Sequence, residues 1–177
     1  MKRLTLVRHA KSSWDDAALA DRDRPLAPRG KRDAPRMGER LRIRKARPSL
    51  ILTSPAKRAR ATAKILARAL HFPKEFLHTE PDLYLAGVHA LLGVVYAQND
   101  RCADLMLVGH NPGLTDFVNT LLPKLRLDNL PTTGIVAVDL DVDQWADVGR
   151  GRAELVYYDY PKNPEVVIGD ERQVKNQ

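Results

Sequence analysis

The sequence of 177 residues has a single cysteine, Cys102, and only 6% aromatic residues. One cysteine cannot form an internal disulfide, and it excludes a cysteine-based metal cluster. No hydrophobic run approaches the length of a transmembrane helix. The apolar run near the N-terminus is also too short for a signal peptide. We therefore expect no membrane partner and a cytoplasmic location.

Acidic residues are in the minority, with 22 Asp and Glu against 29 Lys and Arg, and the formal net charge is +7. The positive charge is spread along the chain, with one denser stretch from Arg22 to Arg47. An anionic substrate or partner suits such a chain, although a basic excess is also common on solvated surfaces. Nucleic acid is not an expected partner, because no aromatic-rich binding element accompanies the charge.

Short apolar runs alternate with amphipathic segments along the chain. This pattern predicts strands at residues 3–7, 48–55, 74–81, 104–110, 134–142 and 153–161. It predicts helices at residues 30–45, 56–70, 88–98 and 112–122. The polar segment 11–26 is predicted to be a loop.

Alternation of strands and helices indicates an α/β fold. We expect three layers, α/β/α, around a mostly parallel central sheet with antiparallel edge strands. The last two predicted strands supply that antiparallel pair. Residues 1–161 are expected to form one domain, followed by a polar C-terminal tail over 162–177.

Charged and titratable side chains follow three of the predicted strands where each strand ends. Arg8 and His9 follow the first strand, Arg58 lies one turn into the helix after the second, and His110 closes the strand at 104–110. Ligands collect beyond the carboxyl ends of parallel strands, so these four side chains are expected to converge. Two guanidinium groups suit the oxygens of a phosphate. The helix near Pro112 is a candidate source of free N–H groups.

Each of these residues taken alone also has a structural interpretation. Arg8 suits an exposed strand end, a lone histidine is more often structural, and Arg58 lies in a basic helix whose charges suit a solvated face. The repeated placement at strand ends favours a site. Trp14 is expected to pack over the loop, with the wall of the pocket as an alternative. Structural or surface roles are expected for the remaining histidines, which are His71, His78 and His89.

The residues around these positions resemble motifs of the histidine phosphatase superfamily. "LVRHAKSSWD" resembles its first motif, "LTSPAKRARATA" its second and "LVGHNPGL" its third. "DRDRPLAPRGKRDA" resembles the stretch between the first two. Within the superfamily, "RHAKSSW", "VGHNPGLT" and "DNLPTTGIVAVDLD" are most similar to the SixA branch, the phosphohistidine phosphatases. The small size of the chain agrees with this branch, since it leaves no room for a large cap domain.

The resemblance implies a metal-independent phosphatase that forms a phosphohistidine intermediate and needs no cofactor. His9 corresponds to the nucleophile, and Arg8, Arg58 and His110 correspond to residues that hold the phosphoryl oxygens. The chemistry agrees with these roles, because a neutral imidazole is a competent nucleophile. We expect the two arginines to lower the pKa of His9 and so keep it neutral.

The substrate is open between phosphohistidine on a protein, which the resemblance favours, and a small phosphorylated metabolite. An inert anion-binding module is the alternative outside the enzymes, although a pure binder has no need of two histidines. Asp15 stands where several relatives have a phosphate-binding Asn, so it is expected to point away or to bind an arginine. Ala27 stands where a helix-capping hydroxyl is common.

One departure concerns the general acid. Relatives with a dedicated proton donor often carry Leu-x-Glu, whereas this chain has Leu83, Tyr84 and Leu85. Glu80 and Asp82 lie nearby and are weak candidates for the missing acid. A phosphohistidine substrate reduces the need for one, because its imidazole leaving group can take a proton from water.

Overall fold

The central sheet has six strands, in a computed structural model that describes residues 1–164. The strand order is β3-β2-β4-β1-β5-β6. The strands are β1 (Lys2–Arg8), β2 (Leu50–Thr53), β3 (Leu77–Thr79), β4 (Asp104–Gly109), β5 (Ile135–Leu140) and β6 (Ala153–Asp159). Strands β1 to β4 run parallel to one another, while β5 pairs antiparallel with both β1 and β6. The predicted mostly parallel sheet with an antiparallel pair is confirmed.

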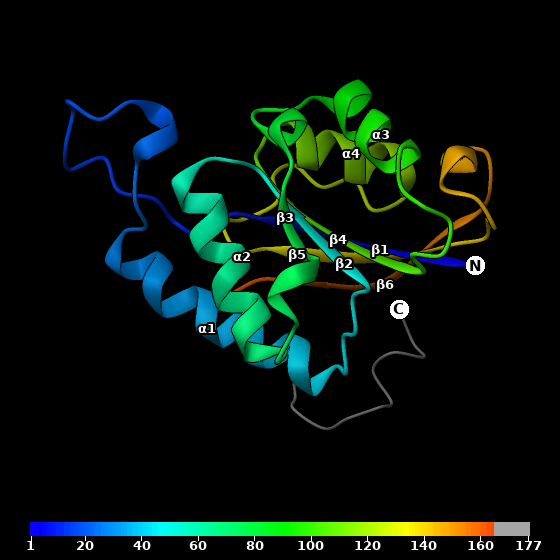
Figure 1. The fold of residues 1–177 in the computed structure, drawn as a ribbon, viewed down its shortest axis with the longest axis horizontal. Helices are drawn as coiled ribbons and strands as arrows, with labels where there is room; N and C mark the ends of the chain where they lie inside the picture. Colours follow the sequence, from blue (N-terminus) through cyan, green and yellow to red (C-terminus); the bar gives the residue numbers. More distant parts are fainter. Residues whose placement is uncertain (165–177) are drawn as a thin grey trace.

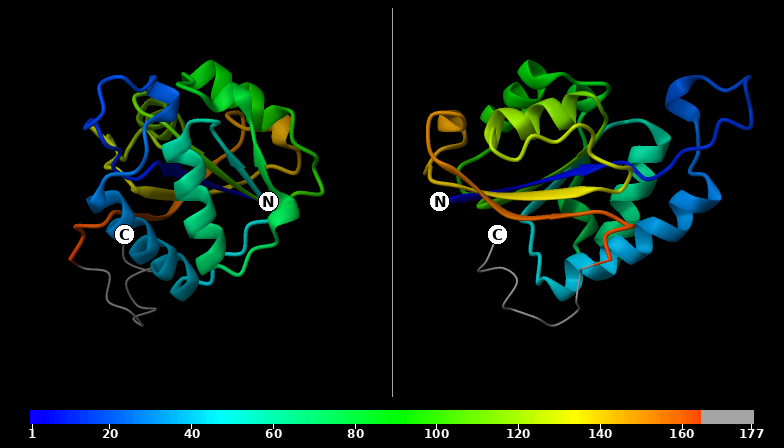
Figure 2. Two further views of the ribbon diagram at one scale, coloured as in Figure 1. Left: turned by 60° about the vertical axis from the view of Figure 1, so that its left-hand side comes forward. Right: turned by 180° about the vertical axis from the view of Figure 1, so that it is seen from behind.

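Helices cover both faces of this sheet, which gives the three predicted layers (Figure 1 and Figure 2). Helices α1 (Pro28–Ile43) and α2 (Lys57–Ala69) lie on one face, and α3 (Val88–Tyr96) and α4 (Gly113–Leu121) lie on the other. Short 3-10 helices occur at Asp21–Asp23, Lys74–Phe76, Pro81–Leu83 and Trp145–Asp147. Within residues 1–164, the α/β fold has no cap domain over the sheet.

Burial on both faces explains the apolar runs of the central strands. Leu4, Leu6 and Leu107 pack in one core with α3 and α4, while Val7 and Val108 pack in a second core with α1 and α2. Strands covered on both sides read as nearly continuous apolar runs, as β1 and β4 do. Packing on both faces therefore holds the central strands in place, and the residues that directly follow these strands are positioned by them.

Most element boundaries lie within a few residues of the sequence prediction. Helix α1 begins at Pro28 rather than Gly30, because a proline is well suited to the first helical turn. Ala27 is its N-cap and offers no side-chain hydrogen bond. Gly30 packs so closely on the Lys11 carbonyl oxygen that a side chain there would collide with it.

The described residues cover the predicted C-terminal tail only in part, and the search for membrane-spanning helices is limited to the same residues. Most of the C-terminal tail at 162–177 lies outside the described residues, so the domain boundary at 161 stays a prediction. Within residues 1–164, none of the helices is long and apolar enough to cross a membrane.

Candidate active site

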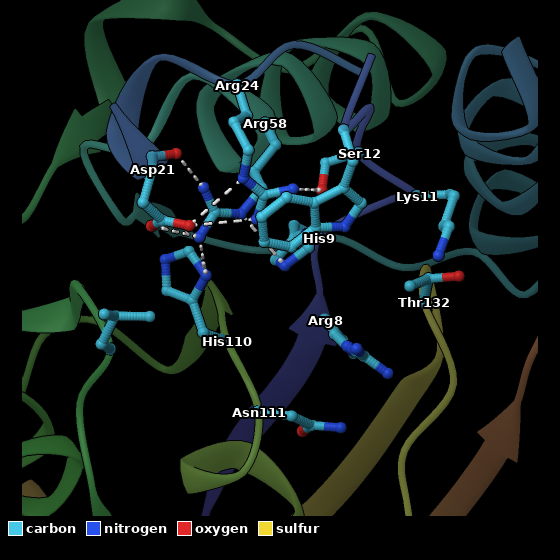
Figure 3. A pocket seen from close by; sticks show the side chains of 12 residues that line it. Arg8, His9, Lys11, Ser12, Asp21, Arg24, Arg58, His110, Asn111 and Thr132 are labelled. Atoms are coloured by element: carbon cyan, nitrogen blue, oxygen red, sulfur yellow. Dashed lines mark hydrogen bonds and ion pairs between the residues drawn. The ribbon is translucent and has the colours of Figure 1, made fainter. Parts of the chain in front are cut away.

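A pocket of about 280 Å³ lies at the carboxyl end of β1 (Figure 3). All four residues that the sequence places at strand ends line it. The complete lining is Arg8, His9, Lys11, Ser12, Trp14, Asp21, Arg24, Arg58, Leu85, His110, Asn111 and Thr132. The pocket is therefore strongly cationic, as an anion-binding site requires.

His9 follows β1 directly and is only 8% exposed. Its Nδ1 lies 2.7 Å from the Ala10 carbonyl oxygen. A carbonyl can only accept a hydrogen bond, so Nδ1 carries the proton and Nε2 keeps its lone pair. Nε2 accepts a hydrogen bond from Arg58 Nε at 3.3 Å. The backbone thus fixes the tautomer that leaves Nε2 nucleophilic.

The pKa of His9 is lowered to about 3. Burial is the largest cause, and electrostatic interactions with His110, Arg58 and Arg8 also lower it. The sequence predicts the direction of this shift but assigns it to the arginines. Both arginines do lower this pKa, but the loss of water around the buried ring contributes more than they do.

Arg58 lies in the first turn of α2, and its side chain is 2% exposed. Its guanidinium donates to the Asp21 carbonyl oxygen at 2.6 Å and to Asp21 Oδ2 at 3.0 Å. One nitrogen also lies 3.4 Å from His110 Nδ1. Arg58 is therefore held in one orientation by three partners, His9, His110 and Asp21.

Asp21 is a pocket residue that the sequence does not predict. Its carboxylate accepts hydrogen bonds from Arg58, from Arg24 at 3.1 and 3.3 Å, and from the Tyr84 hydroxyl. The Tyr84 hydroxyl and the two guanidinium groups hold the pKa of Asp21 well below its ordinary range. A buried arginine requires a carboxylate partner, and this requirement is the signal that points to an acid in the 11–26 loop.

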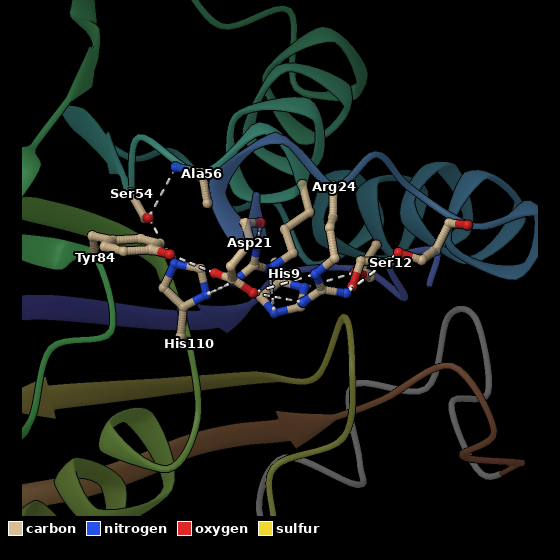
Figure 4. A network of polar contacts seen from close by, with 11 residues as sticks. His9, Ser12, Asp21, Arg24, Ser54, Ala56, Tyr84 and His110 are labelled. Carbon is tan, nitrogen blue, oxygen red and sulfur yellow. Dashed lines mark hydrogen bonds and ion pairs between the residues drawn. The ribbon is translucent and has the colours of Figure 1, made fainter. Parts of the chain in front are cut away.

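His110 follows β4 and is 3% exposed. Its Nε2 lies 2.6 Å from Ser54 Oγ, and this oxygen also accepts from the Ala56 N–H at 3.2 Å (Figure 4). Since Arg58 can only donate to Nδ1, the proton of His110 lies on Nε2 and is donated to Ser54. Burial, aided by the charge of Arg58, lowers the pKa of His110 to about 4. Both pocket histidines are therefore neutral at physiological pH.

Arg8 ends β1 and donates to the Leu130 carbonyl oxygen at 2.9 Å. Its Nε is buried and has no hydrogen-bond partner among residues 1–164. Burial also lowers the pKa of its guanidinium. Figure 3 shows Arg8 beyond the end of β1, in the same pocket as Arg58 and His110.

The sequence and fold of this chain match those of known proteins. The family model of the histidine phosphatase superfamily (branch 1) matches residues 4–83. A SixA protein of Agrobacterium tumefaciens is 28% identical and superimposes with a TM-score of 0.78, over 90% of this chain and 98% of its own. The chain belongs to the histidine phosphatase superfamily. Within the superfamily it is of the SixA type, and it is a phosphatase.

Two further proteins resemble this chain over most of its length. An uncharacterized protein of Mycobacterium tuberculosis is 32% identical over 165 residues, which cover 88% of this chain and all of that protein. The protein histidine phosphatase SixA, solved in complex with tungstate, has a TM-score of 0.75 at 24% identity and covers 90% of this chain and 97% of its own. The second likeness supports the fold alone.

Several sequence-based candidates lie away from the pocket of this histidine phosphatase. Glu80 Oε1 accepts from the Asp82 N–H at 3.1 Å in an exposed turn, and neither residue lines the pocket. Asp15 is exposed and also lies outside the lining. Leu85, at the position of the missing acid, does line it and has a φ of 50°.

Two of the N–H groups at the start of α4, the candidate source of free donors, already have partners. The Leu114 N–H donates to the His110 carbonyl oxygen at 3.0 Å, and the Thr115 N–H lies 3.3 Å from Asn111 Oδ1. Internal partners therefore use these donors.

Trp14 lines the pocket, which is the alternative that the sequence leaves open beside packing over the loop. Its side chain is 71% exposed at the pocket mouth, and the Arg24 guanidinium carbon lies 3.6 Å from the ring centroid. Arg24 itself is buried and donates to Ser12 Oγ at 2.7 Å. The indole therefore forms part of the pocket wall on a firmly held arginine.

Within residues 1–164, no group of three or more His, Cys, Asp or Glu side chains is arranged to hold a metal ion. The charged groups that face the pocket are arginines and Lys11, together with Asp21. This phosphatase thus concentrates guanidinium donors where the phosphoryl group would sit.

Proposed function

We propose that this phosphatase removes the phosphoryl group from phosphohistidine on a protein, with His9 as the nucleophile. The observation that carries the proposal is the hydrogen bond from His9 Nδ1 to the Ala10 carbonyl oxygen at 2.7 Å. That bond leaves the Nε2 lone pair within the pocket that Arg8, Arg58 and His110 also line.

In the proposed first step, His9 Nε2 attacks phosphorus in line with the leaving group. A new N–P bond forms at Nε2 while the P–N bond of the substrate breaks, and the released imidazole keeps a proton taken from water. Arg58 gives up its bond to Nε2 and donates to the phosphoryl oxygens together with Arg8. Donors arranged before the reaction stabilise the charge that these oxygens carry in the transition state.

In the second step, water attacks the phosphorus of phospho-His9. The new O–P bond forms as the N–P bond breaks, the water proton leaves to solvent or phosphate, and neutral His9 is regenerated. His110 remains neutral because burial lowers its pKa, and its bond to Ser54 fixes the orientation of the ring.

The choice of a phosphohistidine substrate rests on the acids available. Asp21 is the one carboxylic acid that lines the described pocket, and three donors hold it ionised. A general acid speeds expulsion of an alkoxide by roughly 10²–10⁴-fold. An imidazole leaves without one, since its second nitrogen can be protonated beforehand. The pocket therefore suits phosphoramidates and activated aryl esters better than alkyl phosphates.

The relatives support the same assignment. The fold matches a protein histidine phosphatase that binds tungstate, a tetrahedral oxyanion. A cytoplasmic location and independence of metal ions and cofactors belong to the proposal as well. Activity that is unchanged after dialysis against EDTA is the expected result, and activity restored only by a divalent cation would overturn this part.

The test of the substrate class compares kcat/KM for a phosphohistidine peptide, p-nitrophenyl phosphate and a sugar phosphate. We expect the peptide and the aryl ester to exceed the sugar phosphate by about 100-fold or more, the size of a general-acid contribution. Glu80→Gln and Asp82→Asn should leave all three values unchanged. A high rate with the sugar phosphate that collapses in either variant would favour a metabolite phosphatase with an acid of its own.

A further inference from the structure

Helix α2 presents a solvent face made of cations. Lys57, Arg60, Lys64 and Arg68 are all exposed, and their spacing of three and four residues places them on one stripe. The opposite side of α2 is buried through alanines, Leu66 and the pocket residue Arg58. The sequence KRARATAKILARA of this helix contains no acidic residue.

This stripe works against the stability of the helix that carries it. Like charges at i and i+4, as in Arg60 with Lys64 and Lys64 with Arg68, destabilise a helix. Cations in the first turn also oppose the helix dipole, and the first turn of α2 has no acidic residue to balance them. Since these cations do not stabilise the helix, binding of a partner explains their presence better than a role in folding does.

The four cations of the stripe have no ion-pair partner in the described part of the chain, although several arginines elsewhere do. The neighbouring helix α1 adds exposed Arg29, Lys31 and Arg32 in its first two turns, again with no acidic residue in the first turn. The charge is therefore available to a ligand.

The cationic stripe begins at the pocket. Arg58, one residue after Lys57, lines the pocket, and α1 starts against Lys11, which lines it as well. Figure 1 shows α1 and α2 side by side on one face of the sheet. A macromolecule seated on this face would bring a side chain to the pocket mouth.

We propose that the α2 stripe, Lys57, Arg60, Lys64 and Arg68, docks an acidic surface of the protein that carries the phosphohistidine. This inference rests on the proposed function. Complementary charge raises the rate of encounter and fixes the orientation of a partner. In the described part of the chain, α1 and α2 carry no exposed large hydrophobic side chain that could stack on bases or insert into a membrane. A protein partner therefore fits this face better than nucleic acid or lipid.

The test uses two phosphohistidine peptides that share one core and differ only in their flanks, which are Asp and Glu in one and Ser and Gly in the other. The wild-type enzyme should have a kcat/KM about tenfold or more higher for the acidic peptide, and the advantage should shrink as salt is raised from 50 to 500 mM. Arg60→Glu with Lys64→Glu should abolish the advantage. The same double variant should hydrolyse p-nitrophenyl phosphate at the wild-type rate.

Arg101→Glu with Lys124→Glu is the matched control, since it reverses two exposed charges outside α1 and α2. It should keep the preference for the acidic peptide. The Arg60 and Lys64 variant should also melt at the same temperature or higher, because it turns the repulsion between positions 64 and 68 into an attraction and places acidic charge nearer the positive end of the helix dipole. A structural role for these cations predicts a lower melting temperature.

The outcomes separate this inference from the proposed function. Equal turnover of both peptides by the wild-type enzyme, or equal losses in the two charge-reversal variants, would overturn the docking surface and leave the phosphatase assignment standing. Failure to hydrolyse either peptide while p-nitrophenyl phosphate is turned over would overturn both. Strong inhibition by an oligonucleotide or by anionic vesicles, lost only in the α2 variant and without any peptide preference, would replace the protein partner with that ligand.

Discussion

Arg58 Nε donates a hydrogen bond to His9 Nε2 across 3.3 Å. The guanidinium that we propose as the main phosphoryl ligand therefore already touches the nitrogen that we propose as the nucleophile. The lone pair of Nε2 accepts this hydrogen bond, so it is available to phosphorus only when Arg58 moves away. As the N–P bond forms, Arg58 must exchange its hydrogen bond to the imidazole for one to a phosphoryl oxygen. The guanidinium therefore stabilises the negative charge of these oxygens close to the forming bond.

Removal of either pocket arginine should be costly. Arg8→Ala and Arg58→Ala are each expected to lower kcat/KM for p-nitrophenyl phosphate by about 30-fold to 1,000-fold, which corresponds to roughly 2–4 kcal/mol of transition-state stabilisation. Arg42→Ala is the control, because Arg42 is exposed on α1 and pairs only with Glu39. Near-normal kcat/KM in Arg58→Ala would remove this arginine from the mechanism.

Asp21→Asn tests the residue that holds Arg58. The substitution keeps the size of the side chain but removes the charge that orients the guanidinium, so kcat is expected to fall by about 10-fold to 100-fold. KM should not rise, because the pocket becomes more positive. Tyr84→Phe, which removes only one hydrogen bond to Asp21, should have a smaller effect of the same kind. A rise in KM at unchanged kcat would instead indicate a role in binding.

Leu85→Glu should create the acid that this pocket lacks. Leu85 lines the pocket and is 57% exposed, so a carboxyl group there can reach a leaving oxygen without being buried. We expect kcat/KM for a sugar phosphate to rise by about tenfold or more, while kcat/KM for a phosphohistidine peptide changes little. Leu85→Gln is the matched control and should not gain activity. Equal gains in both variants would show that shape or polarity, not acid catalysis, is responsible.

The two buried histidines should make stability depend on pH. The pKa of His9 is about 3 and that of His110 about 4 in the folded protein, against 6.5 for an ordinary histidine. The unfolded chain therefore binds more protons between these values, and the free energy of unfolding rises with pH in this window. The stabilisation is complete above about pH 7 and is lost as the pH falls toward 4.

Urea unfolding at pH 7 and pH 5 measures this effect. The wild-type free energy of unfolding should drop between the two conditions by about 1–2 kcal/mol more than that of His110→Asn, which lacks one of the two groups. Equal drops in both proteins would show that His110 does not carry a depressed pKa.

The sequence is sufficient to predict the meeting of Arg8, His9, Arg58 and His110. Arg8, His9 and His110 lie at or just beyond the end of a buried strand, and Arg58 lies in the first turn of the helix that follows one. The carboxyl ends of parallel strands share one edge of the sheet, so these side chains meet there. The contact between Asp21 and Arg58 cannot be predicted in this way. Asp21 lies in a polar loop without periodicity, so the sequence does not indicate where the loop runs. Only the buried charge of Arg58 indicates that such a partner must exist.

Solvent exposure is also hard to predict from local pattern. Trp14 is large and apolar, so packing over the loop is the first expectation, yet its indole stacks on Arg24 at the pocket mouth and stays largely exposed. The cause of the low pKa of His9 is hard to predict for the same reason. Neighbouring arginines are visible in the sequence, whereas the closure of side chains that removes water from the ring depends on tertiary packing.

Trapping the phosphoenzyme tests the central claim most directly. Labelled substrate is mixed with wild-type enzyme and with His9→Ala, and each reaction is quenched in base within milliseconds. We predict acid-labile, base-stable label on the wild-type chain at His9, attached to Nε2 because the Ala10 carbonyl oxygen engages Nδ1. Label that persists in His9→Ala, or that maps to Nδ1 in the wild type, would contradict the account.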